Sequence, residues 1–311
     1  MTSENPSDII KKARPNIKDN SIAMYVSNLN KLKKLFDADN YDFLKDEKKV
    51  LDKLSNLSDN TIRNYLNAIL IYLMAINDKG KLDDEVKIYT ELRDDLNKKY
   101  EDNQASGNIS EKQKENFVDI EEIYKMIETM GKEIKDKKIK KKEDLTSKDK
   151  SLLMIYIIFN IYVRLPMRND IAGMEAISKR QYNKLSESEK KEKNYLVVEK
   201  GKTSKKYEEN KIDVPKDLEK LLRLYIRING MGVLFTTSTG NPLSRNALSQ
   251  LLIKTSKKYM DKSISTTMLR KIYLSSKYAD VKDEMAKDAK VMGHSVDTQQ
   301  KIYVKKNEDE E

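Results

Sequence analysis

Residues 292–303 read Met292-Gly293-His294-Ser295-Val296-Asp297-Thr298-Gln299-Gln300-Lys301-Ile302-Tyr303. This stretch contains the only histidine of the 311-residue chain, and a tyrosine follows it nine positions later. The chain carries 61 lysines and arginines against 51 aspartates and glutamates, a net charge of +10. Such an excess is typical of proteins that bind polyanions, although a merely soluble, lysine-rich protein also accounts for it. An imidazole and a phenol at this spacing in a basic chain predict an enzyme that attacks a DNA phosphate through tyrosine.

The composition excludes several classes of site. The chain has no cysteine, so disulfides, thiolate zinc sites and cysteine nucleophiles are excluded. One histidine excludes a metal site with several imidazole ligands, and we expect neither a metal nor a cofactor. The longest apolar stretch, Leu152 to Val163, is interrupted by Asn160 and is shorter than the ~18 residues of a membrane span. The N-terminus lacks an apolar signal core, so we expect an intracellular protein without a membrane partner.

The apolar pattern divides the chain into two folded parts. Apolar residues recur at three-and-four spacing from Ile22 through Val26 and Leu29, which predicts amphipathic helices. Asn103-Gln104-Ala105-Ser106-Gly107-Asn108 has the composition of a linker. The predicted parts are, in order, a mobile arm over residues 1–18, which carry Pro6 and Pro15, a helical domain over 19–102, a linker over 103–116 and a second domain over 117–311.

Strand signals appear only in the middle of the second part. Tyr195–Val198 and Lys211–Val214 flank the polar turn Gly201–Lys205, which predicts a β-hairpin. The fold class expected is therefore mainly α with a small antiparallel β-sheet or hairpin. Residues 135–142 include six lysines, consistent with a solvated loop or with a loop that follows a phosphate backbone. Helices are expected near 119–134, 152–163, 216–229, 244–260, 266–278 and 281–292.

Phosphoryl transfer without a metal needs a nucleophile, fixed positive charge on the phosphate oxygens and an acid for the leaving oxygen. Arg168 follows the hydrophobic helix, where a guanidinium makes a good bidentate phosphate clamp. Lys202 lies in the hairpin turn, from which a lysine can enter a DNA groove and reach a bridging oxygen. Arg270 stands beside the apolar face of the helix expected over 266–278. Each residue alone fits a surface or structural role as well, and only their order together with the His294–Tyr303 spacing argues against coincidence.

In that order the residues resemble the tyrosine recombinase (phage-type integrase) family. The resemblance covers roughly residues 117–303 and includes Leu234–Ser244, which looks like the stretch before the family's second arginine. Residues 19–102 are similar in size and character to the family's DNA core-binding domain. The motifs that carry the resemblance are Arg168, Lys202, Leu269-Arg270, Gly293-His294-Ser295 and Tyr303.

The resemblance implies a site-specific recombinase or integrase that cleaves and rejoins DNA for the integration or resolution of a mobile element or viral DNA. Tyr303 would form a 3′-phosphotyrosyl bond and Lys202 would protonate the leaving 5′ oxygen. Arg168 and Arg270 would clamp the phosphate, and His294 would donate a hydrogen bond to it. The covalent bond keeps the energy of the phosphodiester, so neither ATP nor a metal is required.

The partners implied are double-stranded DNA and further copies of the chain, a dimer on each site and a tetramer in synapsis. The location implied is the cytoplasm of a prokaryotic cell or, for a viral protein, the host nucleus, the host cytoplasm or the virion. Candidates for further DNA contacts are Arg63, Asn64, Lys205, Lys206 and Arg245.

The sequence departs from the family pattern at three points. Thr267 stands where the family has a second histidine, and a threonine hydroxyl can bind phosphate but is a poor base. Ile171 occupies the usual acidic position after the first arginine, for which Asp170 can substitute. Residues 304–311 end in four acidic side chains, which argues against a C-terminal helix that docks on a neighbouring subunit.

Two other functions stay open at this point. A type IB DNA topoisomerase shares the arginine, lysine, histidine and tyrosine chemistry, and Thr267 favours it slightly, but the helical pattern of residues 19–102 argues against that family's β-rich first domain. A catalytically inactive DNA-binding relative would keep the scaffold, yet it predicts an eroded set of catalytic residues.

Overall fold

The computed structural model describes residues 5–105, 111–142, 144–165, 167–199, 203–207 and 210–303. For residues 105, 112, 203–207, 210–213, 301 and 303 the description is of the backbone alone. The chain forms two compact units, Met1–Ile109 and Ser110–Glu311.

The first unit is a helical bundle built around α4 (Asp59–Ile76). Ser58 caps α4 by accepting a hydrogen bond from the Thr61 amide, and an almost continuous buried run from Leu66 to Leu73 makes this helix the core. The Tyr89 hydroxyl donates to the Leu44 carbonyl oxygen at 2.9 Å inside this core. The remaining helices are α1 (Pro6–Ala13), α2 (Asp19–Leu35), the 3₁₀ turn η1 (Asp42–Lys45), α3 (Glu47–Leu54) and α5 (Asp83–Ala105).

Within the arm expected over residues 1–18, helix α1 corrects the expectation of mobility for Pro6–Ala13, while residues 1–4 lie outside the described residues. Pro6 begins this helix instead of breaking it, because proline fits the first helical turn, where its missing N–H is not needed. Asn5 caps the helix, and Ile10 is fully buried where α1 packs on α2 and α4. The apolar Ile9-Ile10 pair therefore ties the segment to the bundle.

The second unit is organised around α8 (Ser147–Tyr162), the buried helix that the sequence predicts. Thr146 and Asp149 form a capping box at its start. Helices α7 (Ile120–Asp136), α11 (Lys216–Asn229) and α12 (Arg245–Met260) pack on α8. The shorter elements are α6 (Glu111–Lys114), which lies within the expected linker, η2 (Ile139–Lys141), η3 (Asn169–Gly173), α9 (Lys179–Tyr182) and α10 (Glu187–Glu192).

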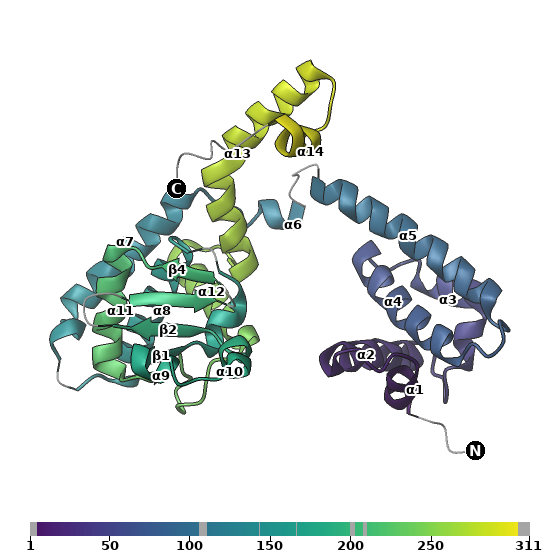
Figure 1. Cartoon of the computed structure of the whole chain (residues 1–311), viewed down its shortest axis with the longest axis horizontal. Helices are drawn as coiled ribbons and strands as arrows, with labels where there is room; N and C mark the ends of the chain where they lie inside the picture. Colours follow the sequence, from purple (N-terminus) through teal and green to yellow (C-terminus); the bar gives the residue numbers. More distant parts are fainter. Residues whose placement is uncertain are drawn as a thin grey trace. The chain divides into compact units, whose positions relative to one another are not determined.

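A small sheet lies beside these helices (Figure 1). Its strands are β1 (Glu175–Ser178), β2 (Tyr195–Val198), β3 (Thr203–Tyr207), β4 (Asn210–Asp213) and β5 (Gly232–Val233). Among the described residues the sheet has the order β4-β3-β2-β1-β5. The hairpin partner of β2 is β3, with Val198 opposite Thr203, and the segment expected to pair with β2 is instead the next strand, β4. The fold is thus mainly α with a small sheet, in which β1 and β2 run parallel and the other pairs antiparallel.

One long helix, α13 (Thr266–Met292), replaces the two helices expected over 266–278 and 281–292. The segment contains neither glycine nor proline, so no residue breaks the backbone hydrogen-bond ladder. Gly293 ends the helix with a φ of 73°, a left-handed conformation that glycine adopts without strain. The short helix α14 (Val296–Thr298) and the π-helical turn η4 (Gln299–Tyr303) follow.

Figure 1 shows α13 extending away from the sheet, with α14 beside its C-terminal end. In the part of the chain that the structure describes, no helix is long and apolar enough to cross a membrane.

Candidate active site

The turn after α8 holds the backbone of Arg168 in place. Tyr162, fully buried at the end of α8, donates a hydrogen bond from its hydroxyl to the Arg168 carbonyl oxygen at 3.3 Å. Arg168 is the N-cap residue of η3, and its exposed side chain makes no hydrogen bond to another described residue. Arg164 differs, because its guanidinium is held by Asp217 at 2.6 Å and by Asn160. Arg164 is therefore a structural arginine, whereas Arg168 has a fixed backbone and a side chain able to take a ligand.

Arg270 lies near this same turn. Burial raises the pKa of the Tyr162 hydroxyl above its ordinary value, the Asp170 carboxylate raises it further, and the Arg270 guanidinium lowers it. The charges of Asp170 and Arg270 thus both reach the Tyr162 hydroxyl, although Arg270 is distant from the turn in sequence. Tyr162 links the two segments, because the same hydroxyl donates to the Arg168 carbonyl oxygen.

The Nε of Arg270 is buried and has no hydrogen-bond partner among the described residues. A buried donor without an acceptor costs free energy, about 1–3 kcal/mol, and a guanidinium donor more. An arginine that served only the fold would be expected to pair with a carboxylate, as Arg164 does. The arrangement at Arg270 therefore suits an acceptor that comes from outside the protein, such as a phosphate oxygen.

Thr267 and Arg245 are exposed residues of the neighbouring helices. Thr267 lies one turn before Arg270 on α13, while its neighbour Thr266 is buried. Arg245 is the first residue of α12, which Ser244 caps by accepting from the Ala247 amide. Both predicted side chains are accessible to a ligand.

His294 and Tyr303 belong to a separate local structure at the end of α13. The His294 amide donates to the Ala289 carbonyl oxygen at 3.0 Å, and its ring Nδ1 lies 3.1 Å from the Ser295 carbonyl oxygen. Gln299 and Ala289 are both buried where the segment after Gly293 packs back on the last turns of α13. Tyr303 ends η4, and its side chain lies outside the described residues.

The predicted catalytic residues are therefore held in two places. The helix between Arg270 and Met292 is continuous, and at about 1.5 Å per residue it is about 33 Å long. Two groups that act on one phosphate must approach it to hydrogen-bond distance. Arg270 and the Arg168 turn both act on Tyr162, whereas His294 follows the other end of α13.

The other predicted residues have less defined surroundings. Lys202 lies outside the described residues. The backbones of Lys205 and Lys206 lie in β3, opposite Leu196 and Tyr195. In the first unit, the Arg63 guanidinium stacks 3.8 Å from the centre of the Tyr100 ring, and Asn64 beside it is exposed.

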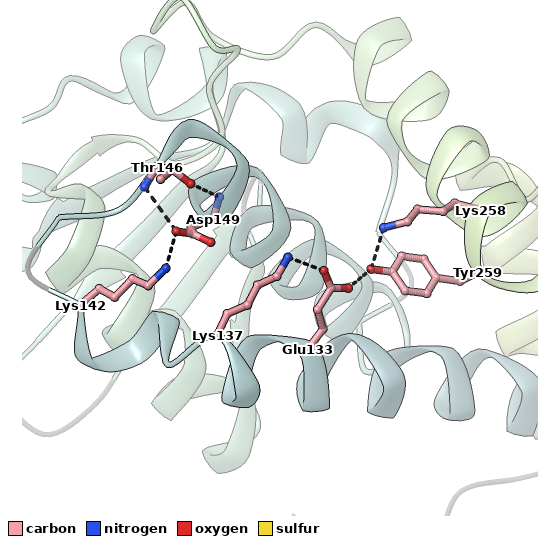
Figure 2. Close-up of polar contacts among 7 residues, drawn as sticks. All are labelled: Glu133, Lys137, Lys142, Thr146, Asp149, Lys258 and Tyr259. Atoms are coloured by element: carbon pink, nitrogen blue, oxygen red, sulfur yellow. Dashed lines mark hydrogen bonds and ion pairs between the residues drawn. The ribbon is translucent and has the colours of Figure 1, made fainter.

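Sequence reasoning missed a polar network between α7, α12 and the start of α8, which Figure 2 shows. The Tyr259 hydroxyl donates to Glu133 at 2.5 Å, and Lys137 donates to the other oxygen of Glu133 at 2.6 Å. The bond to Lys137, followed by that to Tyr259, lowers the pKa of Glu133. Lys142 binds the buried Asp149 at 2.9 Å in the same region. Lys137 and Lys142, two lysines of the stretch 135–142, thus have structural partners.

No protein-family model matches the chain, and no curated protein matches its sequence. In structure the chain is similar to the XerA recombinase, at 11% identity and a TM-score of 0.35, over 98% of this chain and 94% of that one. It is also similar to the XerH site-specific recombinase, solved as a pre-cleavage complex with its difH substrate, at 17% identity and a TM-score of 0.46, over 96% of this chain and 81% of that one. Both are likenesses of fold alone.

Proposed function

We propose that this protein is a site-specific DNA recombinase that cleaves and rejoins DNA through a 3′-phosphotyrosyl intermediate. The observation that carries the proposal is that the Tyr162 hydroxyl binds the Arg168 backbone while the Arg270 charge lowers the pKa of the same hydroxyl. Arg168 has an exposed side chain on a fixed backbone, and Arg270 has a buried Nε that lacks an acceptor among the described residues. Two such guanidinium groups form a preorganised clamp for a phosphate whose negative charge grows in the transition state.

The chemistry assigned to the remaining residues needs only water besides the DNA. The Tyr303 hydroxyl gives its proton to water and its oxygen attacks phosphorus, so that a Tyr–O–P bond forms and the bond from phosphorus to the 5′ oxygen breaks. Lys202 gives its proton to that leaving oxygen. A 5′ hydroxyl of a second duplex then returns a proton to Lys202 and attacks the phosphotyrosine, and the tyrosine oxygen leaves and takes a proton from water. One covalent bond to phosphorus replaces another at each step, which is why no external energy source enters.

Cleavage requires His294 and Tyr303 to approach the phosphate held by Arg168 and Arg270. Residues 274–284 of α13 are all exposed, so a bend in this part of the helix breaks no buried contact. We assign the bend to these residues and regard the continuous helix as the form before DNA binds. The partners on this proposal are double-stranded DNA and further copies of the chain, and the context is the integration or resolution of a mobile element or viral DNA.

A DNA-binding relative that does not cleave is the second candidate, and the separation of Arg270 from His294 along α13 favours it. A type IB topoisomerase is the third, but the described part of the first unit is helical and lacks the β-rich character expected of that family. Recombinases and type IB topoisomerases share the cleavage step, so strand transfer between two duplexes is the activity that distinguishes them.

The test is incubation of the full chain with nicked suicide duplexes that bear candidate element ends. A nick close to the cleavage site makes the fragment that bears the new 5′ hydroxyl too short to stay paired. This fragment diffuses away, so the covalent complex accumulates. We expect an adduct on a denaturing gel with the parent protein and none with Tyr303→Phe, while both bind the duplex. Binding without an adduct on any duplex would assign the protein to the second candidate.

A further inference from the structure

A groove lies at the end of α8 opposite to the Arg168 turn. It consists of two adjoining cavities of about 540 and 770 Å³ between the start of α8 and α12. Both cavities are lined by Ser147, Ser151, Leu251 and Lys254, so they are parts of one surface, here called the α8–α12 groove. Each volume is in the range of about 300–1,000 Å³ that is usual for ligand pockets.

The groove is strongly basic. Among the described residues that line it, Glu133 is the one carboxylate, and its two oxygens are bound by Lys137 and Tyr259 (Figure 2). Asp149, at the same end of α8, is buried and turned toward Lys142 and Thr146. The lysines that line the groove are Lys137, Lys148, Lys150, Lys254 and Lys258.

Three of these lysines have no counter-ion among the residues that the structure describes. Lys148, Lys150 and Lys254 are exposed and form no ion pair with another described residue. The start of α8 adds to their field, because the N-terminal end of a 16-residue helix carries partial positive charge. The local carboxylates are already neutralised, so the charge of the groove calls for an anionic partner from outside.

The floor of the groove is apolar. Leu152, Ile155 and Leu251 line the first cavity, and Met154, Tyr225 and Ile228 line the second. A nucleic-acid backbone has only small sugars between its charged phosphates, so it covers these large apolar side chains poorly. A peptide that carries acidic residues along with large apolar ones matches both the rim and the floor.

We infer that the α8–α12 groove docks an acidic, amphipathic peptide segment of a partner protein. The inference does not rest on the proposed recombinase chemistry. The axis of α8 between Ser147 and Tyr162 is about 22 Å long, so a ligand in the groove leaves the Arg168 turn free. The protein can therefore hold DNA and such a partner at once.

The probe is a synthetic, fluorescein-labelled peptide of helical pattern with glutamates on one face and leucine or phenylalanine on the other. Its anisotropy is titrated with the full chain at low and moderate salt. The test variant combines Lys148→Glu, Lys150→Glu and Lys254→Glu. The matched control combines Lys184→Glu, Lys216→Glu and Lys220→Glu, which changes the charge equally at exposed lysines away from the groove.

We expect the groove variant to bind the peptide about tenfold more weakly than the control variant, since each exposed ion pair contributes a small factor and three are reversed together. A peptide with serines at its apolar positions should bind at least about tenfold more weakly to the parent protein, because it leaves the floor of the groove uncovered. Circular dichroism and thermal unfolding establish that both variants are folded.

Three results would overturn the inference. One is equal peptide affinity of the groove and control variants. Another is a selective loss of duplex DNA affinity in the groove variant with peptide affinity unchanged, which would make the groove a nucleic-acid contact. The third is a changed oligomeric state of the groove variant in sedimentation without any peptide binding, which would assign the groove to a second copy of the chain.

Discussion

The hydroxyl of Tyr162 reaches the carbonyl oxygen of Arg168 at 3.3 Å from inside the core. This contact joins the end of the most apolar helix to the turn that presents the first predicted phosphate ligand. Asp170 and Arg270 act on the same hydroxyl through their charges. Tyr162 therefore binds the backbone of one predicted arginine and lies within reach of the charge of the other, and it is a positioning residue on the proposed function.

Tyr162→Phe should slow DNA cleavage more than it lowers stability. The change removes one hydrogen bond, with a net cost of about 0.5–1.5 kcal/mol to folding. Cleavage should fall by about tenfold to a hundredfold, because catalysis is sensitive to a displacement of about 1 Å. Single-turnover adduct formation and urea unfolding measure the two effects. Tyr195→Phe, at another buried tyrosine of the second unit whose hydroxyl donates to the Glu189 carbonyl oxygen, is the control and should leave the cleavage rate unchanged.

Arg270→Ala should slow cleavage strongly and leave the fold intact. Loss of one preorganised donor to the transition state costs on the order of 10²–10³ in rate. Stability should stay equal or rise, since the buried Nε has no acceptor among the described residues and its removal breaks no bond there. Thermal unfolding and suicide-substrate cleavage test both statements, with the exposed Arg227→Ala as control. A large drop in melting temperature would make Arg270 a structural residue.

The sequence predicts this fold best where one segment determines its own structure. The apolar run of α8, the capped stripe of α4 and the strand Tyr195–Val198 lie where the pattern places them. The pattern fails where the structure of a segment depends on residues that are distant in sequence. Ile10 is buried because α4 covers it, and the polar segment Thr203–Tyr207 gives no strand signal but forms β3 through its pairing with β2.

The candidate site shows the same contrast between what a local pattern predicts and what depends on distant contacts. The order of Arg168, Arg270, His294 and Tyr303 is visible in the sequence, but the role of Tyr162 is not, because its contact with Arg168 depends on how the turn folds. The bond between Tyr259 and Glu133 joins residues 126 positions apart, and no local pattern indicates it. The expected break near residue 280 has no helix-breaking residue behind it, and α13 continues through it.

The Glu133 network predicts a pH dependence of stability. Its bonds to Lys137 and Tyr259 lower the pKa of Glu133, so they stabilise the fold above the unfolded-state pKa, about 4.3, and this contribution is lost as the pH falls through the lower folded-state pKa. Glu133→Gln should therefore cost about 0.2–1 kcal/mol at pH 7 and much less at about pH 3. Urea unfolding at both pH values measures the difference. Glu128→Gln, an exposed change on the same helix, should have no effect at either pH, and an equal cost of Glu133→Gln at both would contradict the charge-based account.

The bend in α13 that the proposed cleavage requires can be tested with proline. Residues 274–284 are exposed, so a kink there costs helix hydrogen bonds and no core packing. Asp280→Pro disrupts a helix interior at a cost of about 3 kcal/mol, and this cost falls on the straight form alone if the active form is already bent. We therefore expect Asp280→Pro to keep or raise the rate of adduct formation on a suicide duplex. Lys220→Pro, at an exposed position inside the packed helix α11, should instead unfold the second unit.

A mixing experiment decides whether one copy of the chain supplies all the groups. If α13 bends within one copy, a mixture of Arg270→Ala and Tyr303→Phe forms no more adduct than Arg270→Ala alone, because neither protein holds a complete site. If the helix stays straight and Tyr303 reaches the clamp of another copy, some pairs in the mixture hold an intact Arg270 beside an intact Tyr303, and the adduct returns. Inactivity of Asp280→Pro together with an adduct from the mixture would overturn the bend and assign the nucleophile to a second copy.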